Sequence, residues 1–138
     1  MIREFNVSDK KYVEAFVREL DENFSFSFEN PFREILIYEE DCIKGIISYS
    51  VIYERIEIDY IYVLEKERNK GIGSALVKSM IKKEKDILSV SLEVKVDNED
   101  AIIFYKKFGF VEKEIKKNYY KGIDGLLLVK ELWLWKMM

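Results

Sequence analysis

The hydrophobic positions of this chain follow two periods, and each period predicts a different kind of element. Apolar and polar residues alternate in short runs rich in β-branched and aromatic side chains, which is the pattern of a half-buried strand. Elsewhere apolar residues recur three and four positions apart, which is typical of an amphipathic helix. Strands are predicted at residues 1–5, 33–40, 43–53, 56–63, 88–94, 110–115 and 126–132, and helices at residues 10–20, 72–84 and 98–108.

The order of these elements predicts the fold class. Residues 21–31, which include the only proline, are expected to form a loop or a further short helix, giving about four helices in all. Ser8 or Asp9 is the expected N-cap of the first helix. The helix at 72–84 is long enough to return the chain to a parallel neighbouring strand, whereas the strands before it read as an antiparallel meander. We therefore expect an α/β fold with a mixed, mostly antiparallel sheet of about seven strands and one central βαβ unit.

Length and composition narrow the class of protein. With 138 residues, of which 49% are hydrophobic and 36% charged, the chain suits a single domain over residues 1–138. The one cysteine, Cys42, cannot form an internal disulfide, and neither a leader nor a membrane-spanning run is recognisable, so we expect a cytoplasmic protein without a membrane partner. The net charge of −3 argues against a nucleic-acid partner.

The chain contains no histidine. Histidine is the commonest general base and a common metal ligand, so its absence limits the chemistry that is available. With one cysteine and no histidine, a metal site is not expected. Any proton transfer must therefore use glutamate, aspartate, tyrosine, lysine or water.

A glycine-containing turn joins the strand at 56–63 to the helix at 72–84. It reads Arg68-Asn69-Lys70-Gly71-Ile72-Gly73, and two glycines one residue apart let the backbone approach a bulky ligand. The unpaired amides and partial positive charge of the helix start then favour a phosphate or pyrophosphate. Neither the dinucleotide fingerprint nor the P-loop pattern is complete here. The alternative is a strand-to-helix turn that needs glycine only for its backbone angles.

A second motif narrows the interpretation of the turn. It reads LEVKVDNEDAIIFYKKFGF and covers residues 92–110. Together the two motifs resemble the GNAT acyltransferases, with R-x-x-G-x-G as their coenzyme A loop. Within that family they are similar to the RimI-type enzymes, which acetylate the terminal alanine of a ribosomal protein. The resemblance covers about residues 56–128 and implies a single-domain GNAT fold with acetyl-CoA (coenzyme A) as cofactor.

The resemblance also implies roles for individual residues. Glu93 would be the general base and Tyr105, which also contacts the cofactor, the general acid. Tyr119 and Tyr120 would help to hold the acceptor in a polar loop at residues 116–125. The backbone around Ile61, Tyr62 and Val63 would pair with the pantetheine arm, with an N–H near Val63 as the donor to the oxyanion. The pyrophosphate and the rest of the cofactor would be held by Asn69, Lys70, Gly71, Ile72, Gly73, Ser74 and Asn98.

Each of these residues also has a structural alternative. Asn98 would serve equally as the N-cap of its helix. Glu93 lies in an alternating strand that would by default place it on the exposed face, and Tyr105 lies on an apolar helical stripe. Two neighbouring carboxylates, Glu57 and Asp59, are rival bases, since other GNAT enzymes take theirs from that strand. Tyr119 and Tyr120 could instead cover the edge of the sheet.

The acceptor and the assembly are left open by the sequence. The protein departs from the family at Asp124-Gly125, where Asp-Ala is usual, and in the tail at residues 132–138. The expected acceptor is a protein α-amine, and the alternatives are a polyamine, an amino sugar or a non-catalytic acyl-CoA-binding module. Trp133 and Trp135 in the tail indicate either a homodimer contact or a cover over the protein's own core, so the chain is a monomer or a homodimer.

Overall fold

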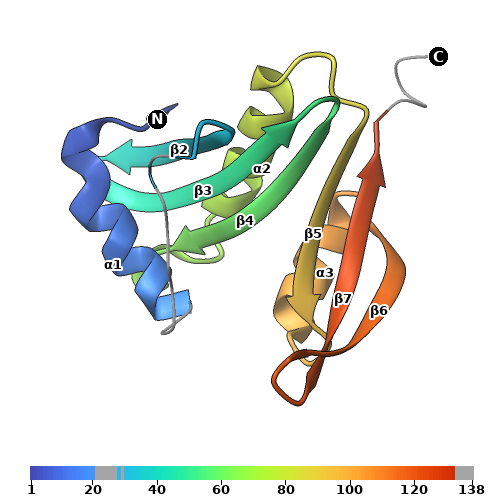
Figure 1. Cartoon of the computed structure of the whole chain (residues 1–138). Helices are drawn as coiled ribbons and strands as arrows, with labels where there is room; N and C mark the ends of the chain where they lie inside the picture. The colour runs from blue at the N-terminus through green and yellow to red at the C-terminus, as the bar shows by residue number, and fades with distance from the viewer. Residues whose placement is uncertain (21–27, 29, 133–138) are drawn as a thin grey trace. The chain divides into compact units, whose positions relative to one another are not determined.

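The helices and strands form along the chain in the order that the hydrophobic pattern predicts. The computed structural model describes residues 1–20, 28 and 30–132 (Figure 1). In this part of the chain the strands are β1 (Ile2–Glu4), β2 (Arg33–Glu40), β3 (Cys42–Ile52), β4 (Arg55–Val63), β5 (Ser89–Lys95), β6 (Val111–Tyr120) and β7 (Ile123–Glu131). The helices are α1 (Lys10–Leu20), α2 (Ile72–Lys83) and α3 (Glu99–Lys107), and two 3-10 turns occur at Val7–Asp9 and Glu65–Glu67.

The strands are hydrogen-bonded in the order β1-β2-β3-β4-β5-β7-β6. The β4–β5 pair is parallel and is connected through α2, whereas β1–β2, β2–β3, β5–β7 and β6–β7 are antiparallel. The predicted seven-stranded mixed sheet with one βαβ unit is therefore confirmed. About four helices were expected. The described residues form three α-helices and, in addition, the two short 3-10 turns. Most of the segment 21–31 and the two tail tryptophans lie outside the described residues.

The chain forms two compact units, the first made of residues 1–51 and 58–85. In this unit α1 and α2 pack on opposite faces of the sheet, because alternate side chains of β3 point to opposite sides. The face under α1 is lined by Val13, Phe16, Val17, Ile35, Ile37, Ile43, Ile46 and Tyr62. On the face under α2, a Cβ at Gly45 would lie 3.1 Å from Ile72 Cγ2 and 3.0 Å from the Tyr62 carbonyl oxygen. Glycine at this position thus lets the start of α2 lie close to the sheet.

The start of α1 differs from the predicted cap. Asn6 is the N-cap of the 3-10 turn that precedes the helix, and the Asp9 carboxylate completes a capping box by accepting from the Asn6 backbone N–H at 2.8 Å. Asp9 is buried and also accepts two hydrogen bonds from the Arg3 guanidinium, at 2.8 and 2.9 Å. These bonds, above all those from Arg3, keep the pKa of Asp9 below its usual range. Asp9 therefore joins β1 to the helix start.

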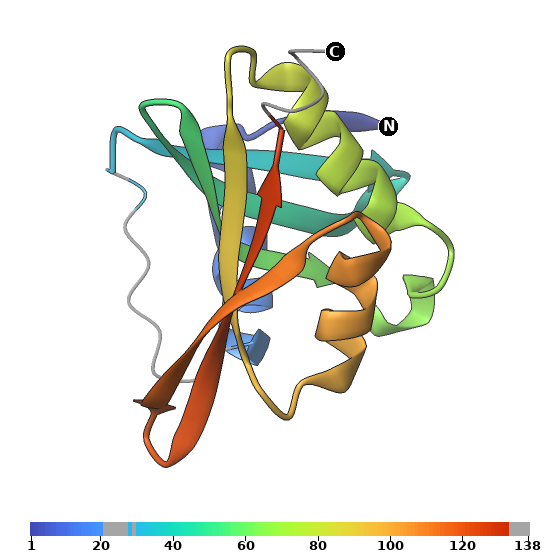
Figure 2. The same cartoon turned by 90° about the vertical axis from the view of Figure 1, so that its right-hand side faces the viewer.

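The second unit contains residues 52–57 and 86–132 of the described chain. Its sheet runs from Arg55–Glu57 of β4 through β5 and β7 to β6. Helix α3 lies along one face of β5 and β7, as Figures 1 and 2 show. Leu92, Leu126 and Leu128 are buried, and Lys130 donates to the Phe108 carbonyl at 2.6 Å. The opposite face of this sheet is not covered by α3 and presents Glu93, Leu127 and Lys116, which we call the open face.

The β6–β7 hairpin is longer than the sequence predicts. Residues 116–120 were expected in a polar loop but belong to β6, and the turn is confined to Lys121 and Gly122. Both turn residues have positive φ, +39° and +95°, which suits a two-residue hairpin turn. The prediction failed because β6 is exposed along almost its whole length and so has no apolar alternation to mark it. Within the described residues, no helix is long and apolar enough to cross a membrane.

Candidate functional site

The glycine turn has a left-handed backbone at two positions before α2. Asn69 and Gly71 have φ of +64° and +85°, and Gly71 is the left-handed N-cap of α2. The first helical hydrogen bond runs from Ala75 N–H to the Gly71 carbonyl, so the amides of Ile72, Gly73 and Ser74 precede the helical ladder. No other atom lies within 4 Å of a Cβ built on Gly71. Three backbone amides thus lie outside the helical ladder, and the space beside Gly71 is open, so the phosphate cradle stays a prediction that this geometry permits.

Charged side chains brace the outside of this turn. Glu67 pairs with Lys70 at 3.1 Å and with Lys44 at 3.2 Å, and these two lysines lower its pKa. Lys70 thus has Glu67 as its partner within the turn. The Arg68 side chain extends back toward the end of β4. Its Nε donates to the Val63 carbonyl at 2.8 Å, and its guanidinium lies 5.6 Å from the centre of the Tyr62 ring.

The end of β4 is fixed by the same residues. Tyr62 stacks on Phe16 with a ring distance of 4.6 Å and donates its hydroxyl to Glu19. The pKa of Tyr62 is raised, mainly by burial and to a smaller extent by the hydrogen bond to Glu19. The Ile61 and Val63 side chains are half-buried. The sequence pointed to the backbone of residues 61–63, but it gave no sign that the Arg68 side chain would occupy the Val63 carbonyl.

Two of the predicted residues lie on α3 in the second unit. The Asn98 side-chain oxygen accepts from the Ala101 N–H at 3.2 Å, so Asn98 is the N-cap of α3. Tyr105 is only 3% exposed and packs edge-on against Phe104 and Phe110, with ring distances of 5.0 and 5.4 Å. Burial raises the pKa of Tyr105, so the phenol stays protonated. Within the described part of the chain, the Tyr105 hydroxyl has no hydrogen-bond partner.

Glu93 lies on the open face of the second unit's sheet, in contact with β6. The Lys116 ammonium donates to Glu93 Oε1, and the Tyr119 hydroxyl also hydrogen-bonds to this carboxylate. Burial raises the pKa of Glu93, but these two donors together outweigh it, so the net pKa is lowered. We call Glu93, Lys116 and Tyr119 the carboxylate cluster. Lys116 is the member that the sequence did not reveal, because its side chain reaches across β7 only once the register of the hairpin is known.

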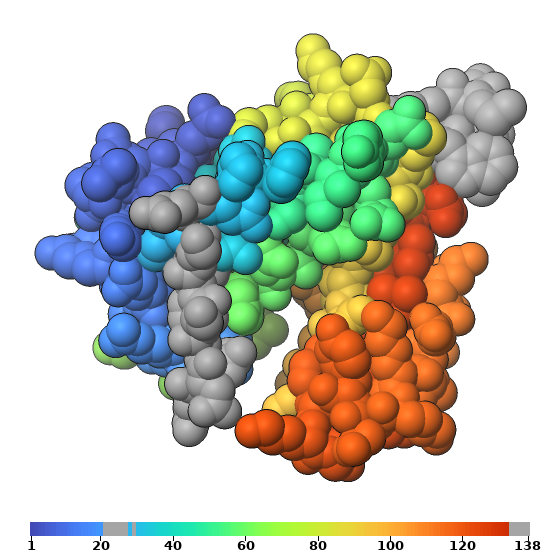
Figure 3. Space-filling view, in the orientation of Figure 1, coloured from blue at the N-terminus to red at the C-terminus, as the bar shows by residue number. Residues whose placement is uncertain are grey.

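The two tyrosines lie at the end of β6 rather than in a loop. Their rings meet edge-on at 4.9 Å, and Tyr119 is 52% exposed. Lys116 Nζ lies 5.2 Å from the Tyr119 ring centre, and Lys95 Nζ lies 5.8 Å from that of Tyr120. The β6–β7 hairpin forms a continuous orange-to-red surface in the space-filling view (Figure 3). Tyr119 is therefore exposed at the end of β6 and contacts both Glu93 and Lys116.

The rival carboxylates are engaged in ion pairs. Asp59 lies 3.5 Å from the Arg33 guanidinium and accepts from the Ser50 hydroxyl at 3.4 Å. Glu57 lies 3.1 Å from Arg55 at the exposed start of β4. An arginine partner holds a carboxylate in one place through charge-assisted hydrogen bonds. Among the described residues no group of three or more potential metal ligands comes together.

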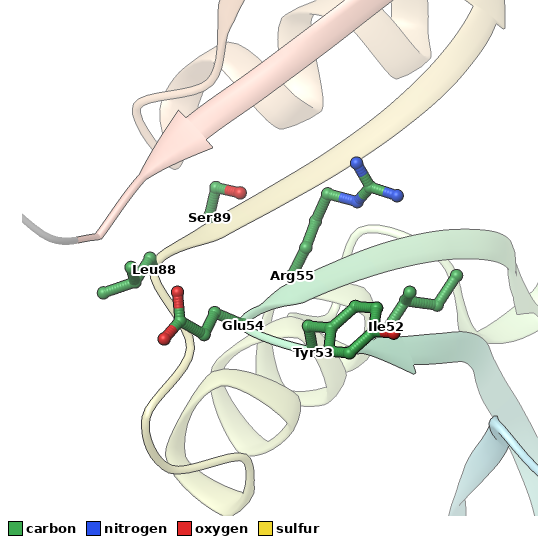
Figure 4. Close-up of a pocket in the computed structure, with 6 residues that line it drawn as sticks. All are labelled: Ile52, Tyr53, Glu54, Arg55, Leu88 and Ser89. Carbon is green, nitrogen blue, oxygen red and sulfur yellow. The ribbon is translucent and has the colours of Figure 1, made fainter.

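A shallow hollow of about 390 Å³ lies in the second unit, around the β3–β4 turn and the start of β5. Figure 4 shows its lining, which consists of Ile52, Tyr53, Glu54, Arg55, Leu88 and Ser89. None of the residues predicted to bind cofactor or acceptor is among them.

Comparisons with known proteins associate the chain with one family. The Acetyltransferase (GNAT) family matches residues 2–110. A putative ribosomal protein bS18-alanine N-acetyltransferase of Bacillus subtilis is 35% identical over 105 residues, which make up 72% of this chain and 70% of that protein. Ard1 from Thermoplasma volcanium has a TM-score of 0.81 and 29% identity, covering 96% of this chain and 97% of that one. A GNAT family acetyltransferase from Elizabethkingia anophelis with acetyl-CoA bound has a TM-score of 0.73 and 21% identity, covering 96% and 97%.

Proposed function

Because the chain belongs to the acetyltransferase (GNAT) family, we propose that it acetylates the N-terminal α-amine of a protein, with acetyl-CoA as the acetyl donor. The family predicted from the two motifs, its fold and its acyltransferase class are confirmed. The observation that carries the choice of acceptor is the carboxylate cluster. It places an anion, Glu93, beside an exposed tyrosine, Tyr119, on the open face of the sheet.

The residues of the glycine turn suit the proposed cofactor. The N–H groups of Gly71, Ile72, Gly73 and Ser74 would hold the pyrophosphate, and Asn69 sets the turn that aims them. Asn98 uses its side-chain oxygen for capping, so its amide nitrogen is the part that would donate to the cofactor. The Ile61–Val63 backbone would pair with the pantetheine arm once Arg68 leaves the Val63 carbonyl. Acetyl-CoA, when bound, supplies the thioester from which the acetyl group is transferred.

Glu93 is the proposed acceptor-side base. An α-amine has an ordinary pKa of about 7.7–8.0, so at neutral pH much of it is protonated and cannot attack. An ionised carboxylate attracts this ammonium and accepts its proton directly or through water. Since the pKa of Glu93 is lowered, the carboxylate is charged throughout the neutral range and passes the proton on to water.

Tyr105 is the proposed acid on the side of the leaving group. Its buried phenol keeps its proton at neutral pH, because burial raises its pKa. None of the described residues uses the hydroxyl as a partner, so the O–H is available to donate to a departing thiolate. The aromatic contacts with Phe104 and Phe110 fix the ring and so fix where that hydroxyl points.

A screen of acceptors tests the proposed function. Short peptides with free and with blocked N-termini would be incubated with acetyl-CoA and the full chain, alongside spermidine and an aminoglycoside. We expect acetylation of the free peptides only, measured by mass spectrometry. Preference for spermidine or the aminoglycoside would assign a small-molecule acceptor. Binding of acetyl-CoA without turnover on any amine would assign a non-catalytic binding module.

The cofactor loop is tested by Gly73→Val. A β-branched side chain at the second residue of α2 should crowd the anion-facing turn and weaken acetyl-CoA binding by about tenfold or more, equivalent to ~1.4 kcal/mol. Lys78→Val places the same side chain at an exposed position of α2 and should keep the parent affinity. Calorimetry with acetyl-CoA, NAD and ATP would provide the constants. Tighter binding of NAD or ATP than of acetyl-CoA would contradict the assignment.

A further inference from the structure

The carboxylate cluster contains a cation that the proposed chemistry does not itself require. Lys116 on β6 pairs with Glu93 on β5, although β7 lies between these strands. The two side chains are 34% and 24% exposed, so the pair is partly shielded from water. The Lys116 ammonium also lies over the Tyr119 ring, 5.2 Å from its centre. Lys116 therefore touches both residues on which the proposed acceptor site depends.

Gly125 on β7 makes this contact across the sheet possible. It pairs with both Lys95 on β5 and Lys116 on β6, so it occupies the middle of the open face between them. A Cβ at this position would lie 3.1 Å from Tyr119 Cβ and Cδ2 and 3.2 Å from Tyr120 Cε2. Because no side chain stands there, the tyrosines pack down over β7 and Lys116 extends toward Glu93. A side chain at position 125 would require Tyr119 and Tyr120 to move by a few tenths of an ångström.

We propose that Lys116 is a positioning residue for Glu93, which holds the carboxylate ionised and oriented toward an acceptor ammonium. This proposal rests on the proposed function, in which Glu93 receives the acceptor. A carboxylate has about four lone-pair positions, so two donors leave room for a third. The bond from Lys116 is charge-assisted, which makes it shorter and stronger than a neutral bond. Lys116 acts through Glu93 and need not touch the reacting atoms.

The surrounding charges make Lys116 the dominant partner of Glu93. On the cluster's own strands, Glu114 precedes Lys116 and Lys95 follows Glu93, with Lys95 directed over the Tyr120 ring. On β4, the charge of Glu57 also acts on the Tyr119 hydroxyl. The Glu57 carboxylate itself forms an ion pair with the Arg55 guanidinium at 3.1 Å. Lys116 is thus the cation that offsets the burial of Glu93. Removing Lys116 takes away a charge and a hydrogen bond that lower the pKa of Glu93, so the carboxyl group should take up a proton at higher pH than in the parent.

The test compares Lys116→Met with Lys117→Met in pH–rate profiles on a free peptide. Lys116→Met should lower kcat/KM about three- to tenfold at pH 5.5 relative to the parent, and this difference should close toward pH 8.5. Lys116→Arg should restore the parent profile, because it returns a cation. Lys117→Met removes the neighbouring, 85% exposed lysine and should leave the profile unchanged. An unchanged profile for Lys116→Met, or an equal shift for Lys117→Met, would overturn the proposal.

A second measurement separates this proposal from the proposed function. The Glu93 carboxyl carbon, labelled with carbon-13, would be titrated by NMR in the parent and in Lys116→Met without any substrate. We expect the Glu93 midpoint to move to higher pH in the variant, whatever the acceptor is. Failure of the peptide assay with this shift present would refute the proposed function alone. Absence of the shift in a variant with the parent's circular dichroism spectrum would refute the role of Lys116.

Discussion

Tyr105→Phe is expected to lower kcat about 10²–10⁴-fold over the whole pH range while acetyl-CoA affinity stays nearly unchanged. The substitution removes one hydroxyl and keeps the ring that packs against Phe104 and Phe110. Since burial raises the pKa of Tyr105, the parent phenol is protonated at every assay pH, and its loss should not create a new pH dependence. Single-turnover rates and calorimetry with acetyl-CoA would separate the chemical step from binding.

A buried tyrosine with a structural role provides the matched control. Tyr49 is fully buried and donates to Glu84 at 2.8 Å, joining β3 to the residue that follows α2. Tyr49→Phe removes the same hydroxyl from a comparable environment and should lower thermal stability rather than kcat. If Tyr105→Phe instead lowers stability and retains full kcat, Tyr105 is a core residue and not the acid.

Glu93→Gln is expected to lower the rate most at low pH and to recover partly as pH rises. The parent carboxylate stays ionised below neutral pH because its pKa is lowered, so it can attract an ammonium where that form dominates. The amide is neutral and loses this attraction, and it leaves the Lys116 ammonium unpaired beside the acceptor. Above the ordinary pKa of an α-amine, about 7.7–8.0, free amine accumulates and the need for a base declines.

Variants of the two rival carboxylates, Asp59 and Glu57, test whether Glu93 is the base. Asp59→Asn and Glu57→Gln would be measured across the same pH range, with thermal unfolding to detect any loss from breaking the Arg33–Asp59 ion pair. Full activity of Glu93→Gln at every pH, together with loss of activity in a stably folded Asp59→Asn or Glu57→Gln protein, would place the base on β4. The role proposed for Glu93 would then be wrong.

Local sequence patterns predicted the elements that have a clear apolar period. The first helix was predicted to begin at Lys10 and end at Leu20 and does so, because Val13, Phe16 and Val17 form one buried stripe. Strand β2 likewise has its predicted bounds. Gly109, which follows the third helix, has a φ of +89°, a left-handed conformation that glycine adopts readily at a helix end. In each case the element is determined by residues within it or directly beside it in the chain.

The features that the sequence did not reveal depend on residues far apart in the chain. The N-cap was expected at Ser8 or Asp9, but the pairing of Asp9 with Arg3 places the cap at Asn6. The contact between Lys116 and Glu93 requires the β5–β7–β6 register, which no local pattern contains. Of the two roles predicted for Asn98, capping needs only neighbouring residues and is confirmed, whereas its contact with the cofactor stays a prediction.

The exposure of β6 has a consequence for assembly. The outer strands of the sheet are β1 and β6, whose unpaired backbone groups could in principle add a strand from another molecule. Strand β1 has only three residues. Strand β6 carries charged side chains on both faces, and its register is interrupted twice, between Glu112 and Glu114 and between Lys116 and Tyr120. Short length at one edge and charge with irregular pairing at the other both oppose edge-to-edge aggregation, so the sheet can leave its margins open without polymerising.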